Sequence, residues 1–167
     1  MKKVLLSIIF AAVIATGTAF AEYPNNKIGV GIIAGYNGSW EGGGSGNLSL
    51  SLKLPQLPIF WAARLEIDGD WFALGVHGDY YIYHEALLPE YNLDWYLGIG
   101  AWVSIWAPND NLGLALGLRL PIGLSWQPID ILEVFLEIAP SLGIQVLDSV
   151  RFPAGGFGIG LGIRVWF

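Results

Sequence analysis

The alternation of large apolar residues with small or charged ones from Leu112 to Trp126 is the feature that most constrains the fold. Every second residue there is leucine, isoleucine or tryptophan, and the residues between them are glycine, alanine, serine, proline or arginine. A period of two is typical of a β-strand whose two faces differ in chemistry. Eight such strands with their large side chains inside would overfill a small soluble barrel. The pattern therefore indicates large side chains facing lipid and small or charged side chains facing a narrow lumen.

The same alternation, divided by turn residues, continues along the chain. It predicts eight strands over residues 27–37, 47–54, 59–68, 71–84, 93–106, 112–126, 131–144 and 154–167. Turn residues at 69–70, 108–111 and 127–128 separate neighbouring strands, and the connection at 85–92 is unusually long. We predict an all-β fold, an eight-stranded antiparallel up-and-down transmembrane β-barrel.

The first segment resembles a secretory signal. Two lysines precede an apolar stretch over residues 4–15, and Ala19 and Ala21 form a small-x-small cleavage site. A membrane helix needs roughly 20 apolar residues, so this stretch is short for a retained anchor, which is the alternative. We predict a signal peptide at 1–21 and a single barrel domain at 22–167.

Composition supports membrane insertion through strands. The chain is 54% hydrophobic, yet no apolar run of helix length follows the first segment. In lipid, only helices and closed barrels satisfy their own backbone groups. The chain has no cysteine, which excludes disulfides and thiolate chemistry.

The last strand alternates apolar residues with glycine from Phe157 and ends on Phe167. This resembles the terminal signature of bacterial outer-membrane barrels. With the segments at 75–80, 96–100 and 134–140, the chain resembles the family of small OmpA-like and OmpX-like barrels. The resemblance implies an outer-membrane location, surrounding outer-membrane lipid, and Phe167 as a signal read by the barrel assembly machinery. A shared activity is not implied.

Aromatic residues on the outward face form a predicted girdle. If the mature chain starts in the periplasm, they lie near the periplasmic ends of their strands, where aromatic belts meet the membrane interface. They are Trp61, Tyr80, Trp95, Trp126 and Phe167.

Charged residues on the inward face are balanced, with five basic and five acidic side chains. They are Lys27, Lys53, Arg64, Arg119, Arg164, Glu66, Asp79, Asp94, Glu133 and Glu137. A charge in a poorly hydrated lumen needs a partner. We therefore predict a lumen ion-pair network of Arg64, Glu66, His77, Asp79, Asp94, Arg119, Glu133, Glu137 and Arg164. Pairing Trp126 with Asp130 across the hairpin places Arg119 opposite Glu137. A charged pore lining is the alternative.

Most of the other acidic residues lie on turns, loops and the segment after the signal, where Arg151 is the one basic residue. Such a surface repels nucleic acid, so we expect no nucleic-acid partner. We expect a monomer.

Two sequence patterns resemble known binding or catalytic motifs, but their positions on strands exclude both functions. The Gly29-x-Gly31-x-x-Ala34 pattern lies inside a strand, whereas a dinucleotide site needs a strand-to-helix turn. Glu133 and Glu137 are four residues apart on a strand, roughly 13 Å at about 3.3 Å per residue. That exceeds the roughly 5 to 9.5 Å between glycosidase carboxylates.

His77 and Asp79 share the lumen face, but no third ligand or nucleophile accompanies them. Lipid-modifying barrel enzymes, the remaining enzymatic alternative, need a histidine with a serine and an acid near the outer rim. We therefore predict no enzymatic activity, no cofactor and no metal. A structural or surface-interaction barrel is the favoured function, and a narrow channel is the alternative.

Overall fold

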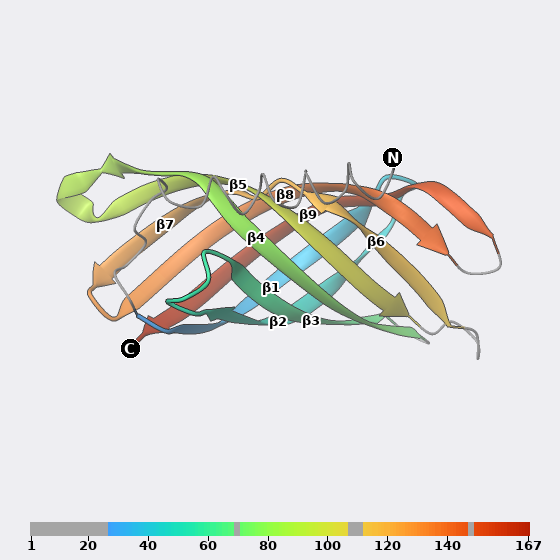
Figure 1. Cartoon of the computed structure of the whole chain (residues 1–167), viewed down its shortest axis with the longest axis horizontal. Helices are drawn as coiled ribbons and strands as arrows, with labels where there is room; N and C mark the ends of the chain where they lie inside the picture. Colours follow the sequence, from blue (N-terminus) through green and yellow to red (C-terminus); the bar gives the residue numbers. More distant parts are fainter. Residues whose placement is uncertain (1–26, 69–70, 107–111, 147–148) are drawn as a thin grey trace, which may run out of the picture.

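The protein is a closed antiparallel β-barrel (Figure 1). The computed structural model describes residues 27–68, 71–106, 112–146 and 149–167. The predicted signal peptide, with Ala19 and Ala21, and the predicted turns at 69–70 and 108–111 lie outside the described residues. No helix within the described ranges has the length and apolarity to cross a membrane.

Within the residues that the structure describes, nine strands and one short 3-10 helix follow one another. They are β1 (Gly29–Ser39), β2 (Gly44–Lys53), β3 (Phe60–Asp68), β4 (Trp71–Leu88), η1 (Pro89–Tyr91), β5 (Leu93–Trp106), β6 (Gly113–Arg119), β7 (Ile122–Ile129), β8 (Leu132–Val146) and β9 (Val150–Trp166).

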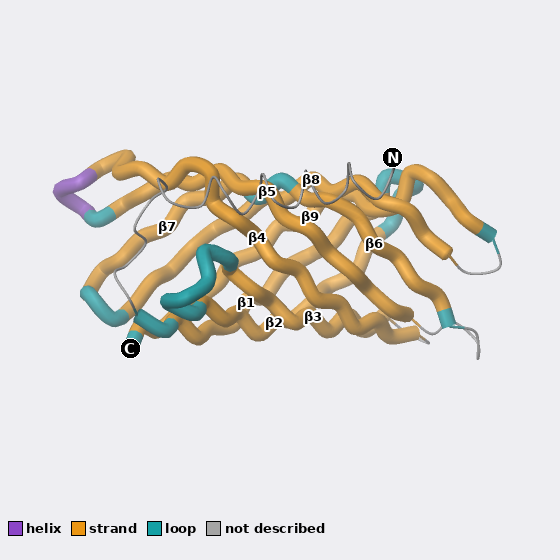
Figure 2. The backbone as a smooth tube through the Cα atoms, in the orientation of Figure 1, coloured by secondary structure: helices purple, strands orange, loops and turns teal. Residues whose placement is uncertain are grey.

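Pairing of the first strand, β1, with the last, β9, closes the sheet (Figure 2). Gly29 of β1 lies opposite Lys53 of β2 on one side and Trp166 of β9 on the other. β6 and β7 both pair with β5 and β8, so together they occupy one place in the ring. The predicted eight-stranded antiparallel barrel is confirmed.

The predicted strand at 112–126 is divided at Leu120 and Pro121. Proline has no N–H for the ladder, and a strand commonly breaks where one occurs. The two residues at the break still make backbone hydrogen bonds to the neighbouring strands. The Leu120 N–H donates to the Pro140 carbonyl at 2.9 Å. The Pro121 carbonyl accepts from Gly98 at 2.8 Å. The barrel wall is therefore continuous at this point.

The predicted turn at 127–128 is wrong. β7 continues through both residues to Ile129, and the turn falls at 130–131. The pairing of β7 with β8 shifts register between Trp126 and Ile129. This irregularity accommodates Pro128 within the strand, where the sequence suggested a turn. Trp126 consequently lies opposite Val134, four residues away from its predicted partner Asp130.

The connection expected at 85–92 is mostly strand. β4 runs to Leu88, which pairs with Leu93, and η1 closes the hairpin with Asn92 at a φ of 52°. Register shifts follow Tyr81 and Ala86. The hairpin projects beyond its neighbours at the end of the barrel where the C-terminus lies (Figure 1). We call this end, where Ile28 and Phe167 exchange backbone hydrogen bonds of 2.9 and 3.1 Å, the terminal end, and the opposite end distal.

The two faces of the wall have opposite chemistry. Large apolar side chains are exposed outward, among them Leu50 at 65% and Leu118 at 60%. Serines and charged residues such as Glu133 are buried inside. A soluble protein buries its large apolar residues, whereas a barrel in lipid exposes them.

Glycines on neighbouring strands allow β6 and β8 to lie close together. Gly117 lies directly opposite Gly143. A Cβ added at Gly143 would collide with the Leu116 carbonyl oxygen and the Gly117 Cα, which are backbone atoms and cannot move aside alone.

We predict that Gly143→Ala destabilises the barrel by about 1–3 kcal/mol, because the added methyl group overpacks the wall. Gly46→Ala is the matched control, since a Cβ there meets no atom within 4 Å. Urea unfolding of the refolded variants in detergent measures both. Equal stability of the two variants would contradict the steric argument.

Candidate functional site

The most buried charges of the barrel form an ion pair near its terminal end. Arg164 Nη1 lies 2.6 Å from Glu133 Oε2, and the two side chains are 2% and 1% exposed. Trp166 Nε1 donates to the same oxygen at 3.0 Å, and the Ser125 hydroxyl donates to the other at 2.8 Å. A buried carboxylate is stable only when its lone pairs are filled in this way.

Aromatic rings surround this ion pair. The Arg164 guanidinium carbon lies 4.7 Å from the ring centroid of Phe60 and 4.5 Å from that of Phe135. Phe60 stacks on Tyr81 at 4.2 Å, and Tyr81 stacks on Tyr96 at 4.3 Å. Cation–π contacts of a desolvated guanidinium contribute about 2 kcal/mol each. We call this group the terminal plug; its members are Phe60, Tyr81, Tyr96, Glu133, Phe135, Arg164 and Trp166.

A second charged group lies midway along the lumen. Arg119 contacts Glu137 through Nη2 and approaches Asp79 Oδ1 to 3.4 Å through Nε. The Tyr96 hydroxyl donates to Glu137 at 3.0 Å, and His77 Nε2 lies 3.7 Å from Asp79. One guanidinium therefore bridges two carboxylates. We call Arg119, Asp79, Glu137 and His77 the middle cluster.

The route by which Arg119 reaches Glu137 differs from the prediction. Arg119 pairs across the sheet with Ser141, and Glu137 pairs with Gly123, because the β7–β8 turn lies further along the chain than expected. The two side chains meet along a diagonal of the wall. The length of the arginine side chain makes this contact possible, and Gly123 leaves room for the Tyr96 ring, whose hydroxyl donates to Glu137.

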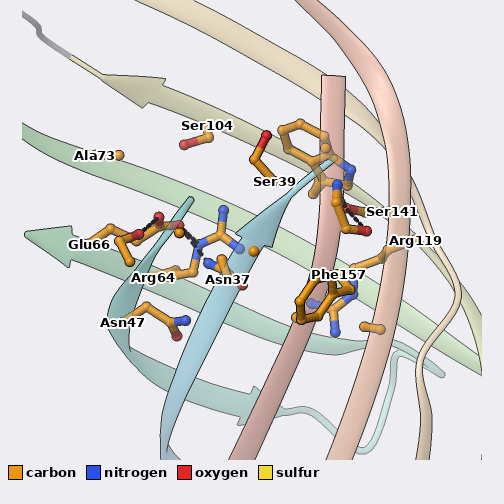
Figure 3. Close-up of a pocket in the computed structure, with 18 of the residues that line it drawn as sticks. Asn37, Ser39, Asn47, Arg64, Glu66, Ala73, Ser104, Arg119, Ser141 and Phe157 are labelled. Carbon is orange, nitrogen blue, oxygen red and sulfur yellow. Dashed lines mark hydrogen bonds and ion pairs between the residues drawn. The ribbon is translucent and has the colours of Figure 1, made fainter. Parts of the chain in front are cut away.

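A third charged group lies toward the distal end (Figure 3). Arg64 Nε lies 2.7 Å from Glu66 Oε1, which also accepts from the Asn37 amide at 2.7 Å. The Ser45 hydroxyl donates to the second oxygen of Glu66 at 2.7 Å. Residues from β1, β2 and β3 thus neutralise one carboxylate.

Asp94 lies apart from these groups. Its carboxylate is 3.4 Å from His84, at the terminal end of β4. Regular alternation along β4 would place His84 on the outward face. The register shift after Tyr81 instead brings it opposite Tyr96, which is buried in the lumen. The irregularity therefore explains why this histidine is missing from the predicted network.

The two remaining inward lysines bond to carbonyl groups. Lys53 Nζ donates to the carbonyls of Leu54 at 2.8 Å and Leu57 at 2.6 Å. Lys27 Nζ lies 3.5 Å from the Asp130 carbonyl.

A cavity of about 510 Å³ occupies the lumen between the middle cluster and the distal end. We call it the distal cavity. The side chains that line it include Asn37, Asn47, Arg64 and Arg119 (Figure 3). Within the described ranges, no group of three or more histidine, aspartate or glutamate side chains could hold a metal ion.

Several solved structures share this fold. Neisserial surface protein A is 13% identical with a TM-score of 0.55, over 84% of this chain and 96% of that chain. The N-terminal β-barrel domain of Pseudomonas aeruginosa OprF is 15% identical with a TM-score of 0.57, over 86% and 98%. No curated protein sequence matches the chain.

These neighbours are small outer-membrane β-barrels, so the chain has the fold of that class. The predicted outer-membrane location agrees with them. A family model described as protein of unknown function (DUF3996) matches residues 63–165, and the chain belongs to this family.

We predict that Glu137→Ala lowers the free energy of unfolding by about 3 kcal/mol, toward the lower end for a broken buried pair because Arg119 keeps Asp79. Because Arg119 also contacts Asp79, the comparison variant is Arg119→Met with Glu137→Leu and Asp79→Asn, which removes the cation and both carboxylates and should recover much of the loss. Reversible urea unfolding provides the comparison. A triple variant no more stable than Glu137→Ala would show that an unpaired Arg119 is not the cause of the loss.

Proposed function

We propose that this protein is a closed integral barrel of the outer membrane with a structural or surface-interaction role. The observation that carries the proposal is the terminal plug, in which side chains from β3, β4, β5, β8 and β9 meet across the lumen. Water-filled barrels of this architecture have more strands, whereas eight strands leave an interior that side chains can fill.

The energetics of the plug also favour a closed lumen. Opening a path past Arg164 and Glu133 would separate an ion pair whose members are almost fully buried. Breaking such a pair costs about 3–5 kcal/mol. A narrow channel remains the alternative function, and it requires these side chains to move apart.

We predict that the refolded wild-type protein gives no steady conductance in a planar lipid bilayer. The double variant Arg164→Ala with Glu133→Ala removes the paired charges together and should give measurable ion conductance. Leu161→Ala on the lipid-facing side of β9 is the control and should stay silent. Steady conductance of the wild type would favour the channel.

We propose that the barrel has no enzymatic activity. A lipid-modifying barrel enzyme needs a histidine with a serine and an acid near the outer rim. Among the described residues, no serine hydroxyl is hydrogen-bonded to His77, which lies deep in the lumen beside Asp79. His84 lies at the terminal end, beside Asp94, and with the mature chain starting in the periplasm this end is opposite the outer rim.

Outer-membrane lipid is the proposed surrounding of the barrel, which we expect to be a monomer. We also propose that the barrel assembly machinery reads Phe167. The backbone of this residue bonds to Ile28, while its side chain is 73% exposed. The exposed ring is therefore accessible for recognition without being needed for the sheet.

We predict that Phe167→Ala lowers the amount of protein in the outer membrane several-fold and increases its periplasmic degradation. The substitution keeps the backbone bonds to Ile28, so a loss reflects the ring alone. Phe167→Tyr, which keeps an aromatic ring, is the control. Immunoblots of fractionated membranes provide the measurement, and wild-type levels of Phe167→Ala would contradict the proposed signal.

A further inference from the structure

We propose that the distal cavity binds a small uncharged sugar, a monosaccharide or disaccharide. Small-molecule sites have volumes of roughly 300–1,000 Å³, and this cavity, at about 510 Å³, lies within that range. It lies on the distal side of the middle cluster, so a ligand there leaves the terminal plug intact. The proposal therefore goes beyond the closed-barrel function and does not depend on it.

One wall of the distal cavity carries two indole rings. Trp102 and Trp106 of β5 lie opposite Gly117 and Gly113 of β6. A Cβ at Gly113 would collide with the six-membered ring of Trp106, and the Trp102 indole N–H donates to the Leu118 carbonyl at 3.2 Å. The Trp106 ring thus lies over Gly113, and the hydrogen bond to Leu118 holds the Trp102 ring against β6. Both side chains line the cavity.

The other side of the cavity is polar. Asn47 and Ser49 of β2 line it there, while Gln145 of β8 lies on the indole side, where it pairs with Ala115 of β6. Within the part of the chain that the structure describes, these three side chains have no hydrogen-bond partner. Amide and hydroxyl groups both donate and accept, as the hydroxyl groups of a sugar require. The two indole rings among the lining residues suit the C–H face of a pyranose ring, which is apolar.

The charges that line the cavity favour an uncharged ligand. They are Arg64, Glu66, Arg119 and Glu137, two cations and two carboxylates. Arg64 is paired with Glu66, and Arg119 with Glu137. A ligand with its own net charge would be left without a compensating group, which is costly in a site of low dielectric.

Isothermal titration calorimetry tests the proposal with the refolded barrel in lauryldimethylamine oxide, a detergent without a sugar headgroup. The probes are glucose, N-acetylglucosamine and maltose, and at least one should bind with one site per barrel. Trp106→Leu and Asn47→Ala should each weaken that binding at least tenfold. Trp126→Leu makes the same substitution as the first on the outer face and should leave the affinity unchanged.

Asn47→Ala keeps the proposal falsifiable if a tryptophan variant does not fold, because its side chain has no partner among the described residues. Failure of all three sugars to bind at 10 mM, which is about ten times a dissociation constant of 1 mM, overturns the proposal. Unchanged affinity in Asn47→Ala also overturns it. Glucuronate binding more than tenfold tighter than glucose would show an anion site instead.

Discussion

A strand in lipid has no water to bond its backbone groups, and the rest of this structure depends on that constraint. The sheet must close, and pairing of β1 with β9 closes it. With eight places in the ring the lumen is narrow, so the inward face carries mostly glycine, alanine, serine and compensated charges, with a few aromatic rings. The large apolar residues are left to face outward.

The charges of the lumen follow from the same constraint. In a narrow interior each cation is stable only beside an anion or a set of acceptors, and the structure places most of its inward charges in three groups along the lumen. The groups differ in what else surrounds them. Aromatic rings enclose Arg164, which makes the terminal end the tightest part, whereas Arg64 borders open space. The lumen is therefore more tightly filled at the terminal end than at the distal end, which leaves the terminal plug at one end and the distal cavity at the other.

Glycines shape both regions as much as the charged residues do. Gly123 leaves room for the Tyr96 ring, whose hydroxyl donates to Glu137, and Gly113 provides the surface on which Trp106 lies. A long or aromatic side chain can lie over a glycine on the neighbouring strand. The pairing of such residues with glycines therefore decides where side chains fill the lumen. The pairing depends on register, which a single strand does not reveal.

The sequence by itself determined the strands, the inward face and the balance of charges, because strand periodicity and the cost of burying a charge are local rules. It also identified Arg119 and Glu137 as partners, although through the wrong register. Only the tertiary structure decided which residues meet across the lumen, since β-irregularities after Tyr81 and Trp126 shift parity and pairing. The terminal plug and the distal cavity arise from that register, so the sequence could not place them.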